Sequence, residues 1–380
     1  MAESGGVVTL VGTYPPTACG LATYTNNLFH AIAAPGSGWH SQVVRVLDRY
    51  EVDTSDEVSA EWIGNDESSL AEAIDVADRS DVIILQHEFG LFAGIDGDDV
   101  LNFVHGVRRP VVVVLHTVLA EPTIHQRAVL EEVMDVASAI IVQSDAALTR
   151  LSAHYSFDRL KLSVIPHGAA ANFSVAPNTR KEPTILTWGL IGPGKGIEHA
   201  IDALALMRHR HSAPKYVIAG ETHPKVREHS GERYRNQLIA RAHALGVSSR
   251  VRFLNQHFDW STLRALIRTA DVVMLPYDSR EQVTSGVLVE AVASAKPVVA
   301  TNFPHARELL AHGGGLIVPQ GDPAAMAAAM ERILYEPGLA ATMSEAARRQ
   351  ARELLWPEVG ARYRSLLNDV VSRSGVGVGG

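Results

Sequence analysis

A loop of glycines around one lysine is the first feature of the sequence that could do chemistry. Gly189-Leu190-Ile191-Gly192-Pro193-Gly194-Lys195-Gly196 follows an apolar, strand-like run and precedes a helix-like one. The spacing fits the P-loop of nucleotide hydrolases, but that loop continues with Ser or Thr to hold Mg²⁺, and here the next residue is Gly196. We therefore reject an NTPase and expect Lys195, with glycine amides such as that of Gly194, to hold a diphosphate at a helix start without a metal. The alternative is a solvated loop lysine.

A second polar loop, residues 276–282, leads from an apolar run into a helix that begins at Thr284-Ser285-Gly286. The hydroxyls of Thr284 and Ser285 and the backbone amides at the helix start, including that of Gly286, are suited to an anion. Glu290 follows inside an apolar stretch, where a carboxylate needs a partner or a ligand hydroxyl. The alternative for Glu290 is a helix glutamate paired with a neighbouring cation.

A third loop, residues 12–20, leaves the first apolar run, contains Pro15-Pro16 and enters a helix at about Gly20. Gly20 would let a ligand approach the backbone, although a tight turn without a ligand also explains it. The loop lacks the G-x-G-x-x-G pattern of dinucleotide sites, which argues against a dehydrogenase. His116 follows the run 111–115 and could contact a ligand or be an ordinary strand-end histidine.

These loops lie between short, β-branched apolar runs, each followed by an amphipathic stretch of helical length. Such runs, buried on both faces, are typical of parallel sheets built from βαβ units. About a dozen strands are too many for one open sheet, so we expect two Rossmann-like α/β domains. The runs are residues 7–11, 43–47, 82–85, 111–115, 139–142, 162–165, 184–188, 216–219, 251–254, 272–275, 297–300 and 316–318.

We expect the domain boundary in the polar, irregular segment 169–183. The first domain then covers residues 1–170 and the second residues 183–355. Trp356-Pro357 interrupts the last helical region, which forces a break or a kink. Residues 356–373 would form a C-terminal helix that could pack back on the first domain.

The composition excludes several classes of protein. The 380 residues carry 34 basic and 42 acidic side chains, a net charge of −8, which argues against a nucleic-acid binder. A single cysteine, Cys19, excludes an internal disulfide and fits a reducing compartment. The sequence has no secretory signal and no apolar stretch of ~18 residues, so we expect a cytoplasmic protein. Its 17 histidines lack the spacing of metal ligands, so no metal site is expected.

The order of these motifs resembles that of the retaining glycosyltransferases of family 4. The loop with Lys195, the helix carrying Glu290 and the segment Ala295-Lys296-Pro297-Val298-Val299-Ala300 follow one another as in that family. The resemblance covers nearly the whole chain and is strongest over residues 184–334. It implies the GT-B fold, in which two Rossmann-like domains face a central cleft. Further matching segments are Gly20, residues 164–168, 304–309 and 315–319, and Asp322-Pro323.

The resemblance also implies a role for each candidate residue. Lys195 would neutralise the diphosphate of a nucleotide-sugar donor, and Glu290 would bind the ribose hydroxyls. Gly20 would lie against the donor phosphate or sugar, and His116 would touch the transferred sugar. The remaining contacts would come from Thr284, Ser285 and Gly286 to phosphate, and from residues 255–258, beginning with Asn255, to the base.

Two positions depart from the family pattern. The family has an arginine after the glycine of its second-domain loop, where this chain has Leu190, and Arg280 and Arg307 are the nearest candidates to replace it. The family's first carboxylate lies eight positions before its second, where this chain has Gln282 with Glu281 beside it. Either Glu281 serves after a shift of the loop, or the amide of Gln282 positions the sugar.

These inferences predict a retaining hexosyltransferase that needs no metal or other cofactor and takes a donor such as a UDP-sugar or a GDP-sugar. The acceptor, a carbohydrate or a glycolipid, would bind to the first domain. Its hydroxyl would lose its proton to the leaving phosphate, since no protein nucleophile is evident. Two alternatives stay open: a glycoside phosphorylase on the same fold, and a non-catalytic sugar-binding protein. No feature predicts an oligomeric state.

Overall fold

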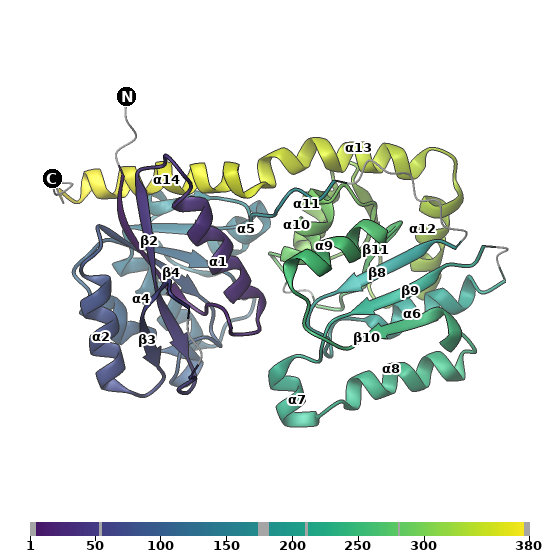
Figure 1. The fold of residues 1–380 in the computed structure, drawn as a ribbon, viewed down its shortest axis with the longest axis horizontal. Helices are drawn as coiled ribbons and strands as arrows, with labels where there is room; N and C mark the ends of the chain where they lie inside the picture. The colour runs from purple at the N-terminus through teal and green to yellow at the C-terminus, as the bar shows by residue number, and fades with distance from the viewer. Residues whose placement is uncertain (1–4, 53–54, 174–181, 210–211, 280–281, 376–380) are drawn as a thin grey trace. The chain divides into compact units, whose positions relative to one another are not determined.

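The computed structural model describes residues 5–52, 55–173, 182–209, 212–279 and 282–375. The chain divides into two compact units (Figure 1): unit 1 contains Met1–Gly168 and Trp356–Gly380, and unit 2 contains Ala169–Leu355. Each unit is built around one sheet whose neighbouring strands are parallel, as the apolar runs predict. Within the described ranges, no helix combines the length and the hydrophobicity needed to cross a bilayer.

In unit 1 the strands lie in the order β3-β2-β1-β4-β5-β6-β7. The inner strands β4 and β5 are buried along their whole length, because helices cover the sheet. The strands are β1 (Gly6–Gly12), β2 (Trp39–Leu47), β3 (Val58–Ile63), β4 (Val82–His87), β5 (Val111–Leu115), β6 (Ala139–Val142) and β7 (Leu162–Val164). The α-helices are α1 (Gly20–Ile32), α2 (Glu67–Ala77), α3 (Val100–Gly106), α4 (Ile124–Val136), α5 (Asp145–His154) and α14 (Trp356–Arg373).

β3 is a strand that the apolar runs do not predict. It lies at the edge of the sheet and pairs with β2 alone. Its buried residues Ala60 and Trp62 alternate with more exposed ones such as Ser59 and Glu61. An edge strand with one solvated face has a period of two instead of a continuous apolar run, which explains why the pattern used for the other strands missed it.

In unit 2 the strands lie in the order β10-β9-β8-β11-β12-β13. The strands are β8 (Thr184–Trp188), β9 (Lys215–Ala219), β10 (Val251–Leu254), β11 (Val272–Leu275), β12 (Val298–Thr301) and β13 (Gly315–Val318). The α-helices are α6 (Ile197–Leu206), α7 (Pro224–Ser230), α8 (Arg233–Ala244), α9 (Trp260–Thr269), α10 (Gly286–Ala293), α11 (Pro304–Leu310), α12 (Pro323–Tyr335) and α13 (Leu339–Ala351). Each of the predicted runs in this half of the sequence overlaps one of these strands.

Each face of the unit 2 sheet has its own apolar core. Ile185 and Met274 lie in the core formed with α6, α8 and α12. Leu186 and Leu275, the next residues along the same strands, lie in the core formed with α9, α10, α11 and α13. Because helices cover both faces, a ligand reaches the sheet through the loops at the ends of its strands.

The C-terminal helix α14, yellow in Figure 1, belongs to unit 1 and packs beside α1. The hydroxyl groups of Tyr24 on α1 and Tyr363 on α14 are buried and lie 2.8 Å apart. Before α14 the chain is extended at Leu355, and α14 then begins at Trp356-Pro357. The break that the proline predicts is therefore present, since proline fits the first turn of a helix but not its interior.

Candidate functional site

The centre of the unit 2 sheet is the point where the winding of the chain changes direction. β9 and β10 extend the sheet from one side of β8, and β11, β12 and β13 extend it from the other. At such a switch point the loops after the two central strands diverge and leave a crevice, which is the usual ligand site of open α/β sheets. The loop after β8 carries Lys195, and the loop after β11 leads into α10.

The loop between β8 and α6 packs closely against the loop after β11. The backbone amide of Asp278 donates to the carbonyl oxygen of Gly194 at 3.0 Å. Gly196 has a φ of +62°, and a Cβ at this position would lie 1.9 Å from the carbonyl oxygen of Pro276. The position after Lys195 is therefore restricted to glycine, and the Ser or Thr of a P-loop has no room there.

Lys195 is a half-buried cation at the end of this loop. Its ammonium nitrogen lies 4.6 Å from the centroid of the Tyr277 ring, and that ring stacks on Phe303. Burial lowers the pKa of the Lys195 ammonium. Among the residues that the structure describes, no carboxylate forms an ion pair with Lys195. A partly desolvated ammonium without a counter-ion favours the binding of an anion.

The start of α10 presents polar groups at the neighbouring strand end. Ser285 caps the helix, and its hydroxyl accepts a hydrogen bond from the amide of Leu288 at 3.3 Å. Gly286 is the first helical residue. The hydroxyl of Thr284 is buried and has no hydrogen-bond partner within the described part of the chain. An anion placed here would receive donors from the amides of the first turn and from Thr284.

Glu290 lies one turn further along α10. Its Oε2 accepts a hydrogen bond from the indole nitrogen of Trp188, the last residue of β8, at 2.9 Å. Burial raises the pKa of Glu290 to about 7. No lysine or arginine of the described ranges pairs with it, so the structure does not support the alternative of a glutamate held by a neighbouring cation. The second oxygen, Oε1, can accept a hydrogen bond from a ligand hydroxyl.

Of the two candidates for the first carboxylate position, the structure describes Gln282, while Glu281 lies outside the described residues, as does Arg280. The side-chain amide of Gln282 donates to the carbonyl oxygen of Thr284. The carbonyl oxygen of Gln282 accepts from the amide of His305 at 3.4 Å. Gln282 is therefore held by bonds to its own loop and to the start of α11.

Two other predicted residues lie on neighbouring elements. Asn255 is exposed after β10, which β9 separates from β8, a distance of ~10 Å across the sheet. Arg307 is exposed on α11. The structure therefore leaves Asn255 at the edge of the sheet and gathers the other candidates of unit 2 around β8 and β11. The gathered residues are Gly194, Lys195, Gln282, Thr284, Ser285, Gly286 and Glu290.

Gly20 and His116 lie in unit 1: Gly20 is the first residue of α1, after the loop that follows β1, and His116 directly follows β5. Gly20 is exposed, and no described atom lies within 4 Å of the position that a Cβ would take, so this glycine leaves open space at the start of α1. The Nε2 of His116 donates to the Oε1 of Gln86 at 2.6 Å. Both positions are suited to a ligand at the carboxyl edge of the sheet.

Histidines gather around Tyr24 at this edge. The rings of His116 and His167 each lie with their centroids 4.9 Å from that of Tyr24. Burial, together with the neighbouring His167 and His87, lowers the pKa of His116 to about 3. Burial likewise lowers the pKa of His87 and that of His167 to about 4. All of these rings are neutral at pH 7 and offer hydrogen bonds without charge.

The sequence does not predict which residues contact the candidate site residues Lys195, Glu290 and Ser285. Tyr277 lies under Lys195, Trp188 donates to Glu290, and the Nδ1 of His305 accepts from the amide of Ser285 at 2.8 Å. Trp188 and Tyr277 carry a signal in hindsight, because each is a large aromatic residue at the carboxyl end of a predicted strand, where ligands bind. His305 carries no such signal.

One group of side chains in unit 2 could hold a metal ion. Glu198, His199 and Asp278 each place a ligand atom within 4.8 Å of the others. His199 Nε2 lies 3.5 Å from Asp278 Oδ2, and Glu198 accepts a hydrogen bond from Tyr234 at 2.5 Å. Burial raises the pKa of Asp278. The same contacts also form an ion-pair network that holds the loop after β11 to α6 without a metal.

Comparison with known proteins finds a family model that matches most of unit 2. The family model described as Glycosyl transferases group 1 matches residues 170–350. The D-inositol 3-phosphate glycosyltransferase of Corynebacterium glutamicum is 28% identical over 263 residues, which are 65% of this chain and 60% of that protein. The protein of the same name from Jonesia denitrificans is 30% identical over 244 residues, 60% of this chain and 55% of that protein. The chain thus spans less than two thirds of the length of these relatives.

Solved structures share the fold of the whole chain. The crystal structure of Anabaena Alr3699/HepE in complex with UDP and glucose has a TM-score of 0.76 at 18% identity and covers 96% of this chain and 100% of its own. Sucrose-phosphate synthase from Thermosynechococcus elongatus has a TM-score of 0.76 at 18% identity and covers 97% of this chain and 99% of its own. These likenesses confirm the predicted fold class. The protein has the GT-B fold, and its residues 170–350 match the family model of the glycosyl transferases group 1.

Proposed function

We propose that the protein is a glycosyltransferase that moves a sugar from a nucleotide-sugar donor to a hydroxyl group of an acceptor. The observation that carries this proposal is the environment of Lys195, a partly buried cation at the switch point of the unit 2 sheet. Its ammonium group lies over the ring of Tyr277, and it forms no ion pair with a described carboxylate. A dianionic diphosphate would supply a counter-charge for this ammonium. The match of residues 170–350 to the glycosyl transferases group 1 family supports the same conclusion.

The diphosphate is the leaving group of this reaction, so the groups that bind it also stabilise the transition state. Negative charge develops on the departing phosphate oxygens as the bond to the sugar breaks. Lys195 and the amide of Gly194 approach this charge from one loop, and Thr284, Ser285 and the amide of Gly286 approach it from the other. Because these donors are fixed before the reaction, they need little reorganisation during it.

Glu290 holds the ribose of the donor in this proposal. Its Oε2 is fixed by Trp188, and Oε1 accepts a hydrogen bond from a ribose hydroxyl. A donor such as a UDP-sugar or a GDP-sugar fits this arrangement, and similar solved structures contain UDP with glucose or UDP-glucose. Asn255, at the edge of the sheet, is then a candidate contact for the base.

The acceptor binds to unit 1 and attacks the sugar on the face that the diphosphate leaves, so that the anomeric configuration is retained. The bond from the acceptor oxygen to the sugar carbon forms as the bond from that carbon to the phosphate oxygen breaks. The hydroxyl proton passes to the departing phosphate. His116, neutral and oriented by Gln86, offers a hydrogen bond to the transferred sugar. The names of curated relatives, inositol phosphate and phosphatidylinositol glycosyltransferases among them, favour a carbohydrate or glycolipid acceptor.

Binding of the donor is tested first with nucleoside diphosphates and their sugars in a thermal-shift panel, because a tight ligand raises the melting temperature by mass action. Turnover is then measured with a radiolabelled nucleotide sugar and candidate acceptors. Transfer of label with release of nucleoside diphosphate supports the proposal. Cleavage of an oligosaccharide by inorganic phosphate would identify a phosphorylase, and binding of sugar without turnover of any donor would identify a non-catalytic protein.

We also propose that the reaction needs no metal ion, because Gly196 leaves no room for a Mg²⁺-binding hydroxyl beside Lys195. Activity is therefore expected to survive treatment with EDTA. Loss of activity on chelation, restored by Mg²⁺ or Mn²⁺, would contradict this expectation and direct attention to Glu198, His199 and Asp278.

A further inference from the structure

The loop that carries Lys195 is joined along its backbone to the loop after β9. The amide of Ile191 donates to the carbonyl oxygen of Glu221 at 2.8 Å, and the amide of His223 donates to the carbonyl oxygen of Ile191 at 2.8 Å. These bonds form an isolated parallel bridge between Ile191 and Thr222. The side chains that follow Thr222 are thereby placed beside the glycine loop, and a Cβ at Gly192 would lie 3.9 Å from that of His223.

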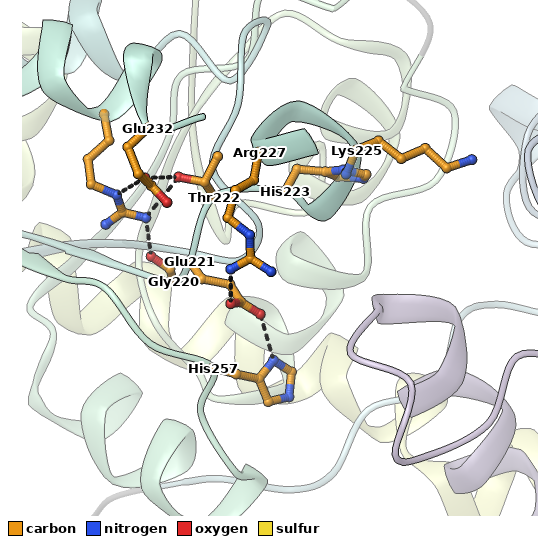
Figure 2. Close-up of polar contacts among 9 residues, drawn as sticks. Gly220, Glu221, Thr222, His223, Lys225, Arg227, Glu232 and His257 are labelled. Carbon is orange, nitrogen blue, oxygen red and sulfur yellow. Dashed lines mark hydrogen bonds and ion pairs between the residues drawn. The ribbon is translucent and has the colours of Figure 1, made fainter. Parts of the chain in front are cut away.

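Buried polar contacts fix this second loop from the other side. Arg235, which is only 4% exposed, donates to the carbonyl oxygen of Gly220 at 3.1 Å and to the hydroxyl of Thr222 at 3.3 Å. Arg235 also donates to Glu232, whose carboxylate accepts from Thr222 as well (Figure 2). A loop held by a buried guanidinium and by a backbone bridge presents its side chains in a defined position before a ligand arrives.

The acidic residue of the loop, Glu221, has polar partners on its own side. Glu221 pairs with Arg227 at 3.3 Å and with His257 at 3.9 Å. Figure 2 shows the Glu221 carboxylate between these two residues, while the side chain of Lys225 extends away from them. Glu221 is therefore engaged by Arg227 and His257, and its charge is directed away from Lys225.

His223 is close enough to two lysines, Lys195 and Lys225, for their charges to act on its ring. Its Nδ1 accepts from the amide of Lys225 at 3.2 Å, so a neutral ring carries its proton on Nε2 and can donate from there. Burial lowers the pKa of His223, and the positive charges of Lys195 and Lys225 lower it further. The positive charges of Lys195 and Lys225 disfavour a proton on His223 in the free protein, and an anion bound near the three side chains would offset these charges.

We propose that Lys225 and His223 supply a second group of contacts to the diphosphate, in addition to Lys195, and replace the arginine that the family pattern has where this chain has Leu190. This inference rests on the proposed function, because it assigns residues to the same diphosphate. Lys225 contributes a full charge from an exposed side chain, and His223 contributes a neutral donor. The glycine loop has Lys195 but lacks the second cation, because Leu190 stands where the family has an arginine. In this proposal the second cation comes from the loop after β9, which is hydrogen-bonded to the glycine loop.

The test measures the affinity of variants for nucleoside diphosphates by titration calorimetry. UDP, GDP and ADP are titrated into the wild-type protein, and the tightest of them is compared with its own nucleoside. Lys225→Ala is expected to bind the diphosphate about tenfold more weakly, the scale of one lost charge-assisted contact, and to bind the nucleoside as the wild type does. Lys225→Arg should restore most of the affinity, and raising the salt concentration should weaken the wild type more than Lys225→Ala.

Lys215→Ala is the matched control. Lys215 is the first residue of β9, ~16 Å before the loop, and its partner is Glu182, so its loss removes the same charge far from the site. His223→Ala should lower diphosphate affinity about threefold, consistent with a neutral donor. Diphosphate affinity in Lys225→Ala within twofold of the wild type would overturn this inference while leaving the proposed function intact. If the wild type binds none of the diphosphates, the proposed function fails and this inference fails with it.

Discussion

At the scale of single residues, the fold places ionisable groups in surroundings that disfavour their charge. Lys195 loses water to the packed loops and gains an aromatic ring, and Glu290 loses water and gains an indole hydrogen bond. Both charges are stabilised less than they would be in solvent, which is why the pKa of the lysine is lowered and that of the glutamate raised. Such residues are typical of binding sites, where the ligand completes the interaction.

Lys195→Ala should lower turnover by roughly 10²-fold, because the variant removes a fixed positive charge from the developing charge of the leaving group. The fold should be unaffected, since no described carboxylate depends on Lys195 for its charge. Steady-state turnover, with a melting curve as the check on folding, measures both. Lys215→Ala should behave as the wild type. Near-normal turnover in Lys195→Ala would remove this residue from the mechanism.

Glu290 should make stability depend on pH in a direction opposite to that of most carboxylates. Its pKa in the folded protein is about 7, above the ordinary value of 4.5, so the folded state binds more protons than the unfolded state between these pH values. Stability contributed by the protonated form is therefore lost as pH rises through about 7. Relative to the wild type, Glu290→Gln without nucleotide should gain stability between pH 5 and pH 8 in urea titrations. If the difference in unfolding free energy between Glu290→Gln and the wild type is the same at pH 5 and pH 8, the pKa of Glu290 is not raised.

Binding of nucleotide should show the reverse dependence. In the proposed function the ribose hydroxyl donates to the ionised carboxylate, so wild-type affinity for a nucleoside should rise as pH passes 7. Glu290→Gln should bind the nucleoside weakly at both pH 5 and pH 8, with a loss of ~1–3 kcal/mol relative to the wild type at pH 8. Calorimetry with the nucleoside avoids the titration of phosphate. Unchanged affinity in Glu290→Gln would show that the role assigned to this helix is wrong.

Lys195 and Glu290 could be predicted from the sequence because each breaks a local pattern: a lysine among glycines and a carboxylate in an apolar stretch. Tyr277 and Trp188 could not be predicted as their partners. Trp188 lies 102 residues before Glu290, and the two meet only because β8 and β11 are neighbours in the sheet. The sequence shows which residues are unusual for their surroundings, while the strand order decides which of them meet.

At the scale of elements, we expect the loop between β11 and α10 to decide which residue contacts the transferred sugar. The side chain of Gln282 is occupied by the carbonyl oxygen of Thr284, so we expect Glu281 to take the sugar-binding role. Glu281→Ala should slow turnover by about 10- to 100-fold, equivalent to a lost contact of ~1–3 kcal/mol, and leave nucleoside diphosphate affinity unchanged. Gln282→Ala should be mild in both measurements. The opposite pattern would assign the role to the amide of Gln282.

The strands were predictable where burial on both faces makes a continuous apolar run, as in β4, β5 and β11. The edge strand β3 was not predictable in this way, because one of its faces is solvated. The bridge between the loops after β8 and β9 has no signature in the sequence. It forms between two backbone segments, and the side chains of Ile191 and Thr222 do not specify it.

At the scale of the whole molecule, unit 1 depends on a helix that follows unit 2 in the sequence. Tyr363 of α14 is fully buried against Tyr24, so Tyr363→Ala should destabilise unit 1 by about 3–5 kcal/mol. Tyr363→Phe, which removes only the hydroxyl group, should cost about 1–3 kcal/mol because the hydroxyl of Tyr24 loses its partner. Urea titrations measure both, and nucleoside diphosphate affinity should not change. A Tyr363→Ala variant as stable as the wild type would show that α14 is dispensable.

The two places where the chain passes between the units adjoin each other. Ala169 and Leu355, the two ends of unit 2, form a backbone bridge, and Gly168 lies so close to Trp356 that a Cβ there would come within 2.3 Å of the indole ring. Unit 2 is thus inserted into unit 1 as a cassette with neighbouring ends. A short linker from Gly168 to Trp356 would close unit 1 without it, and Ala169–Leu355 could be produced alone. The cassette could then be exchanged between related chains. If the donor binds to unit 2 and the acceptor to unit 1, as proposed, such an exchange would change the donor without changing the acceptor.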